Sequence, residues 1–166
     1  MLFRSQIADE RQYVQLASNL ASGQGFRLDP ARLTSMRPPL YPFVVAGVFT
    51  LAGGEDLQAV RAAQVLIGLL VVVATYALSL RMFGARVALV AAAVTCFYPS
   101  LVFSGLLLLT ELLFTLLVLL FVLAYDRTVE TRSTWFALGA GVALGCSALT
   151  RSVLWPFPIE IGRAHV

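Results

Sequence analysis

Hydrophobic and polar residues follow one another in long blocks along this chain. Residues 59–80 form an apolar block with a single charge near its start, which is enough for one membrane-crossing helix at about 20 residues per crossing. A longer apolar stretch covers residues 87–125 and contains one charge, Glu111, so we expect two antiparallel crossings that reverse near residues 98–105. A fourth, shorter crossing is predicted over residues 135–149.

The segment that precedes these blocks is too polar and too interrupted to cross a membrane. Residues 9–24 carry apolar side chains at helical spacing, which predicts an amphipathic surface helix with Asp9 and Glu10 at its start. Residues 43–52 are apolar, but at about 1.5 Å per residue they cover only about half of the roughly 30 Å hydrocarbon core. Prolines within residues 38–42 argue against a regular helix there.

These patterns predict an all-α, polytopic membrane protein with about four spanning helices and with interfacial helices in an external loop. We expect residues 1–58 to form that loop and residues 59–159 to form a transmembrane helical module. Residues 160–166 read Glu-Ile-Gly-Arg-Ala-His-Val, which is what a common short-read sequencing adapter encodes. We therefore expect this tail to be non-native, its histidine to have no role, and the chain to be a fragment of a longer protein.

Composition and charge support the membrane assignment. Hydrophobic residues make up 59% and charged residues 13%, whereas a soluble domain has about 45–50% and about 25%. These values exclude a soluble single-core domain and intrinsic disorder. The net charge is only +3 and the arginines are scattered, so no nucleic-acid partner is predicted. Arginines in the turns at residues 81–86 and 126–134 predict that both turns are cytoplasmic, which places the N-terminal segment, Glu111 and Arg151 on the external face.

Three polar features converge on that external face and are candidates for chemistry. A carboxylate inside a spanning helix costs roughly 2.5–3.5 kcal/mol unless it is paired or solvated, so Glu111 indicates a functional group, an ion pair with Arg151, or a helix-end residue that reaches the interface. Asp9 and Glu10 fit helix capping as well as catalysis. Arg37 stands before two prolines that could aim its guanidinium at a phosphate.

The remaining side chains add little specific chemistry. Tyr41, in the proline-rich turn, is typical of aromatic residues at a membrane interface, and it lies beside the candidates above in sequence. Cys96 and Cys146 stand in separate apolar blocks, which favours packing over a metal or redox pair. The sequence contains no cluster of His and Cys residues, so it predicts no metal site of that kind. A divalent metal bound by carboxylates remains an open alternative.

Seven short motifs follow one another along the chain: Asp-Glu-x-x-Tyr, Gly-Gln-Gly-Phe, Arg-Pro-Pro-Leu-Tyr-Pro, Arg-x-Phe-Gly-x-Arg, Tyr-Pro, Thr-Glu-Leu-Leu and Leu-Thr-Arg. Because these motifs occur in this order, the chain resembles the N-terminal module of membrane glycosyltransferases of the GT-C fold. That broad group includes protein O-mannosyltransferases and lipid A aminoarabinose transferases. The resemblance covers residues 7–158, and it rests on the order of the motifs rather than on any single one.

The resemblance implies a function. Members of this group transfer a sugar from a polyprenyl-phosphate donor, with inversion, to an acceptor on the external face of a membrane, here the bacterial inner membrane. Asp9 falls on the catalytic acid of the group, Glu10 is its neighbour, and Glu111 falls near a second acidic position. Three further residues are implied in substrate binding: Arg37, Tyr41 and Arg151. A first spanning helix would precede residue 1 and further helices would follow, so we expect this fragment alone to be inactive.

Two other functional classes fit parts of the pattern. A secondary transporter or permease fragment explains an intramembrane glutamate, and it predicts repeats of the 59–125 pattern that this sequence does not contain. A non-catalytic membrane scaffold predicts no functional role for Glu111. The expected partners are therefore a polyprenyl-phosphate-linked sugar and membrane lipid, with the acceptor left open.

Overall fold

The regular structure of the described residues is entirely helical. The computed structural model describes residues 2–28, 37–108 and 110–151, and for residues 2–9 and Leu106 it describes the backbone alone. Within these ranges there are seven helices and no strand: α1 (Leu2–Ala21), α2 (Leu40–Ala52), α3 (Leu57–Phe83), α4 (Ala85–Cys96), α5 (Pro99–Leu106), α6 (Glu111–Thr131) and α7 (Thr134–Thr150). The predicted all-α class is confirmed.

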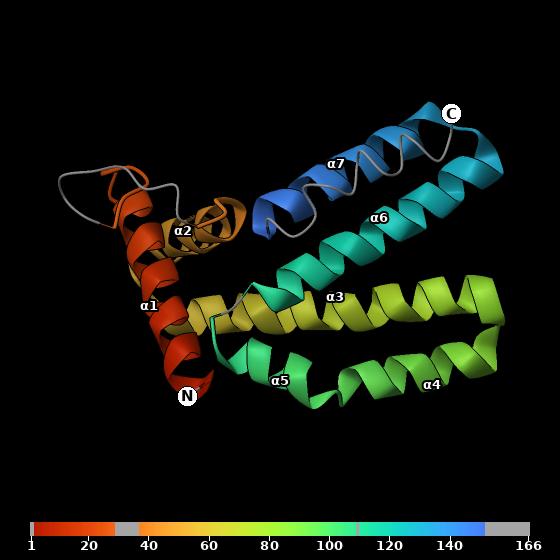
Figure 1. Cartoon of the computed structure of the whole chain (residues 1–166), viewed down its shortest axis with the longest axis horizontal. Coiled ribbons are helices and arrows are strands. Elements are labelled where there is room, and N and C mark those ends of the chain that lie inside the picture. Colours follow the sequence, from red (N-terminus) through yellow and green to blue (C-terminus); the bar gives the residue numbers. More distant parts are fainter. Residues whose placement is uncertain (1, 29–36, 109, 152–166) are drawn as a thin grey trace.

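The helices from α3 onward run back and forth between two ends of the molecule, and α1 and α2 lie at one of these ends (Figure 1). We call this the Glu111 end, because α6 begins there, and the opposite one the Arg81 end. By length and composition, α3 and α6 can each cross a membrane, and α4 with α5 can form a third, bent crossing. Because α7 is a shorter apolar helix that makes a further pass, the arrangement agrees broadly with about four predicted crossings.

Helix α3 extends beyond the apolar block that predicted it. It begins at Leu57 because the Asp56 carboxylate caps it, accepting hydrogen bonds from the backbone N–H groups of Gln58 at 2.8 Å and Ala59 at 3.2 Å. It ends at Phe83, because Gly84 follows with a φ of 84°, which is unfavourable for residues with a side chain. Helix α3 therefore includes residues on both sides of the predicted apolar block.

The two N-terminal helices also differ from the prediction. Helix α1 begins at Leu2, so Asp9 and Glu10 stand inside it and do not start it. Helix α2 begins at Leu40 and takes Pro42 into its first turn, which is tolerated because the N–H groups of a first turn have no partner within the helix. As expected, α2 is too short to cross a membrane.

The reversal predicted near residues 98–105 is wrong in position. Helix α4 ends at Cys96, and α5 continues toward the Glu111 end with a bend of 51°. Pro99 occupies the first turn of α5, where its missing N–H costs nothing, and it therefore starts a new helix and not a return. The chain reverses only between α5 and α6, so Glu111 is the first residue of α6 and not part of the interior of a span.

Two apolar clusters hold the helices together. One lies at the Glu111 end and joins α1, α2 and α3; its largest fully buried members are Tyr41 and Phe49, each 1–2% exposed. The second lies midway along the pair α3 and α6 and contains Val71, Ala74 and Leu116. Many large apolar side chains of α3 and α4 point outward, as is typical of helices in contact with lipid.

Candidate active site

The buried Tyr41 hydroxyl is the centre of a polar cluster at the Glu111 end. Tyr41 stands in the first turn of α2 and packs its ring edge-on against Tyr13 of α1, with centroids 5.2 Å apart. Its hydroxyl oxygen accepts a hydrogen bond from Nε2 of Gln64 in α3 at 3.1 Å. Three consecutive helices, α1, α2 and α3, therefore meet at this one side chain.

Two carboxylates act on the Tyr41 hydroxyl. Burial raises the pKa of Tyr41 far above its ordinary value, and the charges of Tyr13, Glu10 and Glu111 raise it further, while the hydrogen bond from Gln64 lowers it. Glu10 belongs to α1 and Glu111 to α6. Both acids are therefore within electrostatic reach of the same hydroxyl, and the hydroxyl stays protonated.

Arg37 joins this cluster through Tyr13. Its Nε donates a hydrogen bond to Oε1 of Gln12 at 3.0 Å, and its guanidinium carbon lies 5.4 Å from the centroid of the Tyr13 ring. This distance fits a cation–π contact. Because Pro38 and Pro39 follow directly, the backbone that carries Arg37 has little freedom.

Glu111 and Arg151 form the second part of the site. Nη1 of Arg151 lies 3.6 Å from Oε1 of Glu111, and the Arg151 guanidinium also lies 5.7 Å from the centroid of the Phe114 ring. The predicted ion pair is therefore present. As the first residue of α6, Glu111 is also favoured by the helix dipole.

The Glu111 carboxylate is only partly used by this pair. Its second oxygen, Oε2, is buried and has no hydrogen-bond partner among the described residues. An ion pair whose side chains are 46% and 35% exposed contributes little, about 0–1 kcal/mol. The arrangement leaves one acceptor oxygen for a ligand hydroxyl.

A mostly apolar cavity of about 210 Å³ lies between α3, α4, α5 and α6. Gln64 and Leu112 both line it, and these residues neighbour the Tyr41 hydroxyl and Glu111 respectively. A second cavity, of about 460 Å³, lies beside α1 and is lined by Glu10, Ser18 and Glu55. Gln64 therefore links the polar cluster around Tyr41 to a cavity with an aliphatic lining, and Glu10 lines a second cavity together with Ser18 and Glu55.

The structure treats the six candidate residues differently. It brings Glu10, Tyr41 and Glu111 into one electrostatic cluster, with Arg37 and Arg151 attached to it. The backbone of Asp9 lies in α1 directly before Glu10, and its side chain lies outside the described part of the chain.

Sequence reasoning missed Tyr13 and Gln64 as members of the site. A signal was available for Gln64, because it is an amide in the interior of an apolar spanning block, where polar groups are costly. Tyr13 fits the apolar face of the amphipathic helix predicted over residues 9–24, and only its contacts with Tyr41 and Arg37 reveal a second role.

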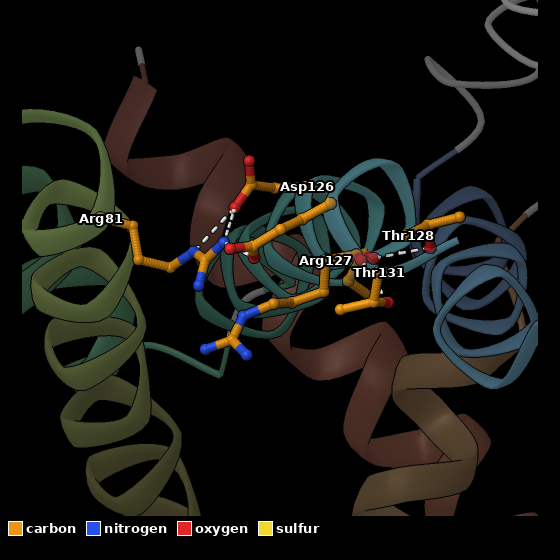
Figure 2. Close-up of polar contacts among 7 residues, drawn as sticks. Arg81, Asp126, Arg127, Thr128 and Thr131 are labelled. Atoms are coloured by element: carbon orange, nitrogen blue, oxygen red, sulfur yellow. Dashed lines mark hydrogen bonds and ion pairs between the residues drawn. The ribbon is translucent and has the colours of Figure 1, made fainter. Parts of the chain in front are cut away.

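The opposite end carries a different charge arrangement. Arg81 of α3 reaches Asp126 and Glu130 of α6, at 2.7 and 2.6 Å, and Figure 2 shows its guanidinium meeting the Asp126 carboxylate. Thr128 and Thr131 bond back to carbonyls of their own helix. No group of three or more His, Cys, Asp or Glu suited to a metal lies in the described parts of the chain, at either end.

The fold and the site define a multi-pass helical membrane protein with a cluster of acids, arginines and tyrosines at one end. A family model described as dolichyl-phosphate-mannose-protein mannosyltransferase matches residues 36–161, which is most of the chain. The chain belongs to this family, and membership implies a membrane glycosyltransferase whose donor is a lipid-phosphate-linked sugar. The matched range excludes α1, and therefore Asp9 and Glu10.

The search of curated proteins and the search of solved structures each found no match. The family assignment confirms the resemblance drawn from the order of the seven motifs. Four candidate residues fall inside the matched range: Arg37, Tyr41, Glu111 and Arg151.

Proposed function

We propose that this protein transfers a sugar from a polyprenyl-phosphate donor to an acceptor at the external face of a membrane, with inversion at the anomeric carbon. The observation that carries the proposal is the Glu111 carboxylate, whose Oε1 pairs with Arg151 at 3.6 Å while its buried Oε2 has no hydrogen-bond partner among the described residues. A carboxylate placed in this way can orient both a phosphate-binding cation and a sugar hydroxyl, and family membership supports sugar transfer.

The proposed chemistry begins with Asp9 as general base. Asp9 takes the proton of the acceptor nucleophile, the nucleophile attacks the anomeric carbon, and the bond from that carbon to the phosphate oxygen breaks. The polyprenyl phosphate leaves with negative charge, which the guanidinium of Arg37 or Arg151 stabilises. Both guanidiniums belong to the described cluster, one through Tyr13 and one through Glu111.

Glu111 holds the sugar in this proposal. Its Oε1 faces Arg151, so that the carboxylate orients a cation for the phosphate. Its buried Oε2, which has no hydrogen-bond partner in the described structure, is suited to accept a bond from a sugar hydroxyl. One carboxylate thus orients both the leaving group and the sugar.

The two cavities give each substrate an approach. The aliphatic lining of the smaller cavity, beside Leu112, suits the lipid chain of the donor. The larger cavity is lined by Glu10, Ser18 and Glu55, whose side-chain oxygens can accept hydrogen bonds from a hydroxylated acceptor. We place the Glu111 end on the external side of a bacterial inner membrane, because the short turns at the other end carry Arg81, Arg86, Arg127 and Arg132, and arginines in short loops favour the cytoplasmic side.

The first test is sugar transfer by the complete protein in its membrane, with a radiolabelled polyprenyl-phosphate sugar as donor. We expect Glu111→Gln to lower kcat/KM about 100-fold, since it removes a charge that orients both the leaving group and the sugar of the donor. Glu130→Gln is the matched control, because it changes the same residue type in the same helix at the opposite end and should keep nearly full activity. Equal activity of the two variants would contradict the role of Glu111.

The second arm of this test concerns the general base. Asp9→Asn should lower turnover by about 100- to 10 000-fold without unfolding the protein, because the amide cannot accept the proton. Glu10→Gln separates the two neighbouring acids and should cost less. Near-normal turnover of Asp9→Asn would refute the base assignment, and wild-type protein that transfers no sugar from any polyprenyl-phosphate donor would refute the proposed function.

A further inference from the structure

Gln64 is an unusual residue for its position. It lies within the long apolar helix α3 and is 2% exposed. A buried amide in such surroundings is costly unless its polar atoms form hydrogen bonds. Its contacts therefore show what the fold gains from a glutamine at this position.

The Gln64 amide links three parts of the chain. Its Nε2 donates to the Tyr41 hydroxyl of α2 at 3.1 Å and to the Leu107 carbonyl at 3.4 Å. An amide nitrogen carries two hydrogens, so both bonds can exist at once. Leu107 belongs to the link between α5 and α6, where the chain reverses direction just before Glu111.

Gln64 also lies between the apolar cavity and the buried Tyr41 hydroxyl. It lines the apolar cavity together with Gly105 and Leu112, and it bonds to the hydroxyl on which Glu10 and Glu111 act. The close approach of α5 to α6 supports this placement, because a Cβ added at Gly105 would lie 3.4 Å from the Leu112 side chain. A shift of the link between α5 and α6 would therefore displace the start of α6.

We propose that Gln64 is a positioning residue, which holds the Tyr41 hydroxyl and the start of α6 in register and so sets Glu111 relative to the occupant of the apolar cavity. The inference rests on the proposed function for its kinetic consequence, but its structural part stands by itself. Gln64 does not take part in bond making. It acts through Tyr41 and through the Leu107 carbonyl.

The kinetic test uses Gln64→Met in the complete protein, since methionine keeps the length of the side chain and removes the donor. We expect kcat for sugar transfer to fall about tenfold to 100-fold, because misplacing a reacting group costs rate, while KM for the polyprenyl-phosphate donor changes less than about threefold. Tyr41→Phe combined with Gln64→Met should lose no more than the worse single variant. Ser147→Ala is the control, because Ser147 is equally buried and bonds to Leu144 within its own helix.

A second measurement is independent of turnover. Thr110, the residue before Glu111, is 7% exposed, so a Thr110→Cys variant in a background without Cys96 and Cys146 should react slowly with a maleimide. Adding Gln64→Met should raise that labelling rate about tenfold, since the hydrogen bond that holds the link is lost. The Ser147→Ala control should leave it unchanged.

The outcomes separate the two proposals. Unchanged kcat with a lower melting temperature, or an unchanged labelling rate at position 110, would overturn the positioning role of Gln64. Wild-type protein that transfers no sugar would overturn the proposed function, and the labelling rate would then still decide whether Gln64 holds the start of α6.

Discussion

At the scale of single residues, the Tyr41 hydroxyl is defined by its surroundings. Its oxygen accepts from Gln64, its ring packs on Tyr13, and its burial raises its pKa. A phenol that stays neutral can donate a hydrogen bond to a neighbouring oxygen across the whole physiological pH range. Tyr41 is therefore a fixed donor or acceptor at this site and not a group that titrates during turnover.

The raised pKa of Tyr41 predicts how stability depends on pH. The folded protein keeps this proton above about pH 10, where an ordinary tyrosine releases it, so the free energy of unfolding should fall as pH rises beyond that value. Melting temperatures of the detergent-solubilised protein between pH 8 and pH 11 would measure this. Tyr41→Phe should show a smaller fall, whereas Tyr98→Phe, which changes an exposed tyrosine, should match the wild type. Equal pH dependence in all three proteins would contradict the burial of Tyr41 in solution.

At the scale of elements, α3 and α6 are joined in two different ways. Midway along, Val71 and Ala74 pack against Leu116. At the Arg81 end, one guanidinium binds two carboxylates of α6 that stand one turn apart, Asp126 and Glu130. The two helices are therefore joined by apolar packing midway and by ion pairs at the Arg81 end.

This arrangement predicts a modest, specific loss on Arg81→Gln. We expect the melting temperature to fall by a few degrees, because the pairs are partly exposed and exposed ion pairs contribute little. Arg81→Lys should recover only part of the loss, since a single ammonium does not reproduce the fork of a guanidinium. Arg127→Gln, which removes a neighbouring arginine on α6 (Figure 2), should have no effect. A fall in both glutamine variants would indicate a general effect of net charge.

At the scale of the whole molecule, the two ends differ in chemistry. The Glu111 end gathers acids, arginines and tyrosines from α1, α2, α6 and the end of α7, whereas the Arg81 end has short polar turns with an internal ion-pair network. Helix α3 runs from one end of the molecule to the other and is by itself long enough to cross a membrane. We therefore expect the two ends to lie on opposite sides of the membrane. The orientation proposed above then puts the site outside.

Cysteine labelling tests this orientation directly. In a background without native cysteines, Glu55→Cys at the Glu111 end should react with a membrane-impermeant maleimide added to intact cells, because Glu55 is exposed. Thr131→Cys at the Arg81 end should react only after the membrane is permeabilised. The reverse labelling pattern would show that the Glu111 end is cytoplasmic, and it would contradict an external site.

Several features of this protein follow from the sequence because they depend on local properties. The length of an apolar block is a local quantity. Block length predicted the spanning helices α3 and α6, and it also predicted that α2 is too short to cross a membrane. The helix ends were less predictable, because Asp56 extends α3 by capping and Pro99 starts a helix where a reversal was expected. The family resemblance rested on motif order, which needs no coordinates.

The sequence by itself determined the helical class, the alternation of crossings and the residue types that carry charge, since hydrophobic block length decides what can lie in lipid. Only the tertiary structure decided which of those residues meet. The bond from Gln64 to Tyr41, the reach of Glu10 and Glu111 to one hydroxyl, and the binding of Arg81 to α6 join positions far apart in the chain. Such contacts depend on where helices bend and reverse, and no local pattern specifies them.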